Sequence, residues 1–121
     1  MAFSKREAIQ IIDKLVELTQ HGRIEWVEEQ PPAYLIASDS KVDLVYVTTY
    51  LNRHIRTYKR DFKYWIDDVQ FTWDKEVVIE FVDENGRRMG RFPHTPNTPE
   101  LLRAIQYQNP QLQTFFNDMF G

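Results

Sequence analysis

Apolar residues recur at helical spacing near both ends of the chain. At the N-terminus they form the stripe Ala8, Ile11, Ile12, Leu15 and Leu18. Intervals of three and four residues are typical of one buried face of an α-helix. Ser4 and Glu7 have the spacing of a capping box, and Gly22 stands where a left-handed residue would end the helix. The pattern predicts a helix over residues 5–20.

Two shorter helices are predicted at the C-terminal end. Thr98 followed by Pro99 is typical of a helix start, and Asn109 followed by Pro110 repeats that signal. The apolar positions that follow these starts are Leu101, Leu102 and Ile105, and then Leu112, Phe115, Phe116, Met119 and Phe120. The second set falls at i, i+3, i+4, i+7 and i+8, so it forms a continuous apolar face on one helix.

The region between the helices alternates apolar and polar residues and is rich in Val, Tyr, Thr and Phe, as in β-strands. Pro31-Pro32 interrupts it. The predicted strands cover residues 23–29, 33–38, 41–51, 54–65, 71–73 and the two sides of a hairpin within 76–92. We therefore expect an antiparallel meander of about six strands.

Asn85-Gly86 predicts a two-residue type I′ turn in that hairpin, since both residues tolerate positive φ. The resulting pairs are Glu84 with Arg87, Asp83 with Arg88, Val82 with Met89, Phe81 with Gly90, Glu80 with Arg91 and Ile79 with Phe92. Three of these pairs join an acid to a base. Basic residues also dominate 51–65 and acidic ones 66–86, so charges should neutralise one another between neighbouring strands.

These elements predict one α+β domain over residues 1–121, a normal size for a single core. Its order is an N-terminal helix, the antiparallel meander and two short C-terminal helices. Helices with single apolar stripes must bury them, and one face of the sheet is the available surface. We expect all the helices on that face, which leaves the opposite face open.

Composition excludes several kinds of chemistry. The chain has no cysteine, so disulfides, thiolate metal sites and cysteine nucleophiles are absent. His21, His54 and His94 lack the spacing of a metal motif, and no G-x-S-x-G or glycine-rich phosphate loop occurs. We expect no metal, no cofactor and no catalytic residue. Without an apolar segment long enough for a membrane span or a visible signal peptide, a cytoplasmic, non-enzymatic protein is expected.

Aromatic and basic side chains alternate along residues 53–65, and even positions share one face of a strand. The candidate binding residues are Arg56, Tyr58, Arg60, Phe62 and Tyr64, joined by Val78, Val82, Met89 and Arg91 from the hairpin. Rings with arginine have the composition of protein interfaces. This favours binding of a protein partner or of a second copy in a homodimer. The alternatives are a single-stranded nucleic acid bound by residues 53–65, and arginines that simply pair with the acidic strands.

The end of the first helix and the segment after it contain Thr19-x-x-Gly22-x-Ile24-x-Trp26. This pattern resembles the opening of various small bacterial α+β proteins without an assigned role. The resemblance covers eight residues. It implies no activity and no functional residue.

Overall fold

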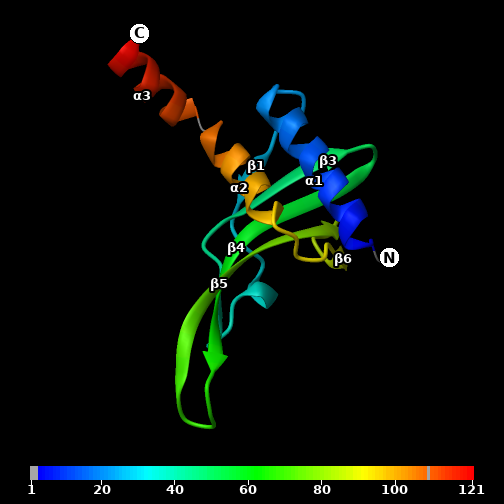
Figure 1. The fold of residues 1–121 in the computed structure, drawn as a ribbon, viewed down its shortest axis with the longest axis vertical. Coiled ribbons are helices and arrows are strands. Elements are labelled where there is room, and N and C mark those ends of the chain that lie inside the picture. Colours follow the sequence, from blue (N-terminus) through cyan, green and yellow to red (C-terminus); the bar gives the residue numbers. More distant parts are fainter. Residues whose placement is uncertain (1–2, 109) are drawn as a thin grey trace.

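One antiparallel sheet carries the helices α1 and α2 on one of its faces (Figure 1). The computed structural model describes residues 3–108 and 110–121, with the backbone alone for 110–113. Its elements are α1 (Lys5–Gln20), β1 (Val27–Glu29), the 3₁₀-helix η1 (Ala33–Leu35), β2 (Ser40–Lys41), β3 (Val45–Tyr50), β4 (Arg53–Trp65), β5 (Phe71–Val82), β6 (Arg88–Arg91), α2 (Thr98–Tyr107) and α3 (Pro110–Phe120). The predicted α+β class and element order are confirmed.

The strand order is β1-β3-β4-β5-β6, and β2 pairs with the far end of β4. β4 and β5 form the longest ladder, which runs from His54 opposite Val82 to Trp65 opposite Phe71. This ladder continues beyond the other strands and projects from the body (Figure 1). We call its outer part, residues 61–75, the arm. Only at its base, at Asp61 and Phe62, does the arm also pair with β2, so much of its surface is open to solvent.

Helices α1 and α2 cover the same face of the sheet, as expected. Ala8 and Ile12 of α1 and Leu101 of α2 are buried in one cluster with Ile55 of β4 and Ile79 of β5. The capping box is present, with Ser4 Oγ accepting from the Glu7 N–H and the Glu7 carboxylate accepting from the Ser4 N–H. α3 differs from the expectation. Its described side chains, from position 114 on, are exposed, because α1 and α2 already occupy the face of the sheet.

The opposite face is closed over the body of the sheet, so the expectation of an open face is wrong there. The segment after Pro31-Pro32 turns across it as η1 instead of forming the strand predicted over 33–38. Leu35 N–H donates to Pro32 O in the first turn of η1. Leu35 is then buried with Tyr58 of β4 and Val78 of β5. The two prolines disfavour a continuous strand, and the turn after them carries a leucine onto the sheet.

Several strands begin or end at other residues than predicted. The strand expected over 23–29 is reduced to β1, and Thr48 Oγ1 donates to Glu25 O in the segment before it. The strand expected over 41–51 is divided into β2 and β3, which lie on successive parts of β4. The short strand predicted at 71–73 is part of the continuous β5.

The turn at Asn85-Gly86 is longer than predicted. Gly86 alone has positive φ there, at 80°, and its N–H donates to Asp83 O while Asp83 N–H donates to Arg87 O. This is a three-residue turn whose left-handed residue is glycine. Val82 therefore pairs with Arg88 and not with Met89, and a bulge restores the predicted pairs Phe81–Gly90 and Glu80–Arg91.

Positive φ at two successive turn residues occurs instead at Leu51 (51°) and Asn52 (62°), between β3 and β4. Tyr50 pairs with Arg53 across this turn. The two-residue turn that was predicted for the β5–β6 hairpin thus joins β3 and β4.

The Thr19-to-Trp26 pattern has a structural role. Gly22, at φ 69°, ends α1 as predicted, and Arg23 N–H donates to Leu18 O. The indole N–H of Trp26 donates to Thr19 Oγ1 over 3.1 Å. The pattern therefore turns the chain back along the end of α1, which accounts for its threonine, glycine and tryptophan.

Candidate functional site

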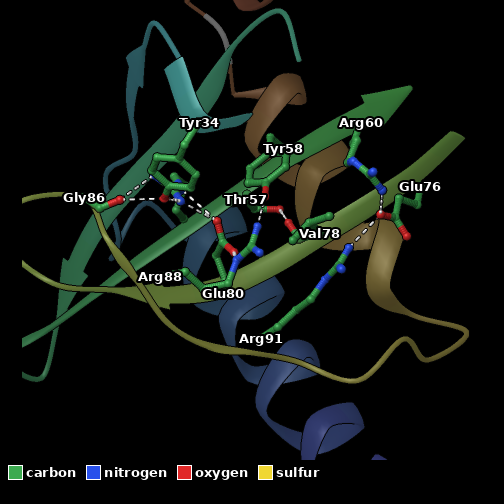
Figure 2. A network of polar contacts seen from close by, with 11 residues as sticks. Tyr34, Thr57, Tyr58, Arg60, Glu76, Val78, Glu80, Gly86, Arg88 and Arg91 are labelled. Carbon is green, nitrogen blue, oxygen red and sulfur yellow. Dashed lines mark hydrogen bonds and ion pairs between the residues drawn. The ribbon is translucent and has the colours of Figure 1, made fainter. Parts of the chain in front are cut away.

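The even-numbered face of β4 forms a polar network under η1 (Figure 2). Glu80 of β5 lies opposite Arg56 of β4 and is fully buried. Its Oε1 accepts from Arg56 Nε over 2.9 Å and from Arg56 Nη2 over 2.6 Å. Its Oε2 accepts from Arg88 of β6. One carboxylate on β5 thus holds an arginine from each of the two neighbouring strands, β4 and β6.

The same network fastens η1 to the β5–β6 turn. Arg56 donates to Gly86 O over 3.0 Å and to the hydroxyl of Tyr34. The Tyr34 hydroxyl itself donates to Gly86 O over 2.7 Å. Burial opposes the charge on Arg56, but its bonds with Tyr34 and Glu80 outweigh burial and raise the pKa of Arg56. Arg56 is therefore a permanent cation that joins three parts of the chain.

Tyr58 is buried beside this network and accepts from Arg88 Nη2 over 3.0 Å. Burial, with the Glu80 charge next, raises the pKa of the Tyr58 hydroxyl. The hydroxyl is therefore neutral near neutral pH and less acidic than a free tyrosine. It is a packed hydrogen-bonding group and is not poised for proton transfer.

A second carboxylate repeats the arrangement four residues away along β5, opposite Arg60. Glu76 Oε1 accepts from Arg60 Nη1 and from Arg91 Nη2, each over 2.7 Å (Figure 2). Burial acts to raise the pKa of Glu76, but the bonds from Arg91 and Arg60 prevail and lower it. Arg60 also donates to Ser40 of β2 over 2.8 Å. The predicted neutralisation of charge between strands is therefore seen in the structure.

The candidate binding residues consequently do not form one surface. Arg56, Tyr58, Val78 and Val82 are buried. Arg60 and Phe62 are half-buried, while Tyr64, Met89 and Arg91 are exposed. Tyr64 lies on the arm, whereas Met89 and Arg91 lie on β6. Buried Arg56 stabilises the sheet, and any binding by this face is restricted to the exposed positions.

The arm instead exposes aromatic residues on its other face. Lys63 and Trp65 of β4 lie opposite Trp73 and Phe71 of β5. The Lys63 ammonium lies 4.3 Å from the centre of the Phe71 ring and 5.7 Å from the rings of both tryptophans. Lys41 of β2 lies 4.5 Å from the Trp73 ring. We call Lys41, Lys63, Trp65, Phe71 and Trp73 the arm cluster.

Large rings seldom remain open to solvent, yet the arm cluster keeps them so. Trp65 is 51% exposed and Trp73 is 43% exposed. Phe71 packs against both, with ring centres 5.1 Å from Trp65 and 6.0 Å from Trp73. These contacts hold the rings in place without covering them. Its β4 residues, Lys63 and Trp65, stand at odd positions. The predicted binding face used the even positions and therefore did not include them. The available signal was that Lys63 and Trp65 are two residues apart, so a cation and a large ring share one face of the strand.

The edge of β5 beside the arm cluster is open. Among the described residues, β6 pairs with β5 only near Glu80–Val82, and no strand lies along Phe71–Lys75 on that side. Ile79 O accepts from Phe92 N–H at this edge, so by alternation Phe71, Trp73 and Lys75 turn their backbone N–H and C=O groups to it. The Lys75 N–H donates to Asp74 Oδ1 over 2.7 Å. The outer end of β5 therefore offers backbone groups to a further strand.

Within the described part of the chain, no group of three or more His, Asp or Glu side chains is placed to hold a metal ion. None of the described helices has both the length and the apolar character to span a membrane. Comparisons of the chain with protein-family models, with curated proteins and with solved structures found no match. The arm is therefore interpreted from its own geometry.

Proposed function

We propose that the protein is a non-catalytic protein-binding module and that the arm is its binding surface. The observation that carries this proposal is the coincidence, on residues Phe71–Lys75, of an open strand edge with exposed aromatic rings. Tryptophan contributes large contact areas at interfaces, and exposed apolar clusters mark interaction sites. The body of the sheet, in contrast, is closed on both faces.

The geometry favours an extended partner segment that adds to β5. Backbone bonds to the edge would give affinity, and alternate side chains of the partner would meet the arm cluster. Lys41 and Lys63 flank the rings, so carboxylate side chains beside apolar ones in the partner complement this surface. The segment would displace the Asp74 carboxylate from the Lys75 N–H. The proposed partner is thus a protein strand with apolar and acidic side chains.

A photoreactive residue placed at Val69, at the tip of the arm and 81% exposed, tests the proposal in the native cells. We expect one defined protein adduct from this position and none from Gln10, an exposed position on α1. Lys75→Pro removes the outward N–H and should abolish the adduct. Lys75→Ala keeps the N–H and removes the charge, so it should retain most of the adduct. Equal adducts from both positions, or an adduct that survives Lys75→Pro, would contradict the proposal.

Single-stranded nucleic acid is the second candidate, and the ammonium groups beside the Trp73 ring favour it. Stacked bases and neutralised phosphates need rings and cations side by side. A labelled oligonucleotide titrated at two salt concentrations tests this reading. Binding that weakens steeply with salt and with Lys63→Glu, but not with Lys75→Pro, would favour nucleic acid over a protein strand.

A further inference from the structure

The C-terminal helix α3 presents apolar side chains to solvent. Phe115, Phe116, Met119 and Phe120 are each more than half exposed. Phe116 and Phe120 pack only against each other's rings at 5.0 Å among the aromatic contacts of the described residues. Figure 1 shows α3 leading away from the sheet and from α1. A helix with such a face is stable in water when another surface covers it.

An open groove of about 1590 Å³ lies at the same end of the molecule. Its apolar lining comes from α1, the segment after it, β3 and α2, and consists of Val16, Ile24, Trp26, Tyr46, Ala104 and Ile105. Polar side chains, including Gln20, Glu28 and Arg103, surround this lining. The groove exceeds the roughly 300–1,000 Å³ of small-molecule sites. Its volume and apolar lining suit a helix that carries several large side chains.

The short link between α2 and α3 restricts how a chain could fill its own groove. Gln108 caps α2, and α3 begins at Pro110. Two residues therefore lie between the helices, which is the shortest link of the two to five residues that join antiparallel helices. The groove is lined up to Gln108 itself, so a helix that occupies it must run back along α2. A helix from another molecule has no such restriction.

We infer that α3 of one copy docks in this groove of a second copy, and that the exchange is reciprocal in a two-fold dimer. The same contact is then made twice, as closed symmetry requires. Each α3 carries three phenylalanines, and the exposed parts of the six in two copies, at about 150–250 Å² for each whole ring residue, supply roughly 800 Å². The two grooves supply a somewhat smaller area, so the interface falls within the roughly 1,200–2,000 Å² of stable complexes. This inference does not depend on the arm.

Sedimentation of the full chain over a range of concentrations tests the inference. We expect a dimer that the double change Phe116→Glu/Phe120→Glu weakens by at least about thirtyfold, as for central interface residues. Asn117→Glu adds charge to the same helix outside the apolar stripe and should leave the dimer intact. Circular dichroism of each variant confirms that the exposed substitutions leave the fold unchanged.

Cysteine cross-linking identifies the contact, because the natural chain has no cysteine. One chain carries Asp118→Cys on α3 and another carries Glu28→Cys beside the groove. After mixing and mild oxidation we expect a disulfide between them. Asp118→Cys mixed with Arg87→Cys, on the β5–β6 turn away from the groove, should give little product.

Three results would overturn the inference. The first is a monomer at every concentration. The second is a dimer that tolerates Phe116→Glu/Phe120→Glu, because another surface would then hold it. The third is an internal disulfide in a monomer that carries both Asp118→Cys and Glu28→Cys, because α3 would then fill its own groove.

Discussion

Arg56 and Glu80 form an ion pair that is almost wholly removed from solvent. Arg56 Nη2 lies 2.6 Å from Glu80 Oε1, and the two side chains are 3% and 0% exposed. A buried charge is costly unless it is paired and hydrogen-bonded. Glu80 has a second cationic partner in Arg88. The pair lies between η1 and the β5–β6 turn, so the position of η1 on the sheet depends on it.

Replacing Glu80 should therefore be severe. Glu80→Gln leaves Arg56 buried without its anion, and the expected loss in the free energy of unfolding is about 3–5 kcal/mol. Urea denaturation measures it. The matched control is Glu17→Gln, which breaks the exposed pair with Lys14 at 3.8 Å and should cost about 0.5 kcal/mol or less. Similar losses for both variants would contradict the buried role of Glu80.

Acid should weaken the contact between β5 and its neighbours through Glu76. The pKa of Glu76 is lower in the folded protein than its usual 4.5. A lowered folded pKa means that the stabilisation is present above about pH 4.5 and is lost as pH falls through the folded value. Wild type should therefore exceed Glu76→Gln by up to about 1 kcal/mol at neutral pH, since the pair is partly exposed.

Urea denaturation of both proteins between pH 7 and pH 3 measures this difference. The gap should close as pH falls below 4.5. Glu84→Gln, an exposed change on the β5–β6 turn, serves as the control and should give a small difference at every pH. A gap that stays constant down to pH 3 would show that the Glu76 carboxylate does not act through its charge.

Leu51 offers a simple gain in stability. It adopts φ 51° in the turn before β4 and is 72% exposed. The left-handed region costs a residue with Cβ roughly 1–2 kcal/mol, and Asn tolerates it better than Leu. Leu51→Asn should raise the free energy of unfolding by about 0.5–1 kcal/mol in thermal or urea denaturation. Leu51→Ala removes the exposed side chain but keeps the strain, so it should give no such gain.

Local sequence signals predicted much of this fold. The capping box at Ser4 and the glycine at position 22 located both ends of α1. Charge alternation predicted that basic and acidic strands would neutralise each other, and Glu80 was expected to face an arginine. Each of these features depends on residues close in sequence or on adjacent strands. Such contacts follow from backbone periodicity and charge alone.

The closed face of the sheet could not be predicted in the same way. Arg56 and Glu80 have the residue types of a solvated surface, and nothing in their strands indicates that Tyr34 lies over them. That contact joins residues 22 positions apart and depends on how the chain turns after Pro31-Pro32. The arm cluster could have been predicted, because alternation along paired strands places Lys63, Trp65, Phe71 and Trp73 on one face. It was missed because the predicted binding face followed the even positions of residues 53–65, whereas Lys63 and Trp65 lie on the odd face.

The open edge of β5 leads to a prediction about proline. Lys75 turns its N–H away from β4, where Asp74 meets it, so Lys75→Pro removes no bond of the β4–β5 ladder. Proline is tolerated at such edge positions, and the expected loss in the free energy of unfolding is under about 1 kcal/mol.

Thr72 lies opposite Tyr64 and turns its N–H towards β4 by alternation. Thr72→Pro removes a ladder donor, with a loss of about 1–3 kcal/mol. Amide exchange separates the two variants, because only Thr72→Pro should accelerate exchange in the arm strand of β4. Rapid exchange in both would mean that the outer edge of β5 is not the free one.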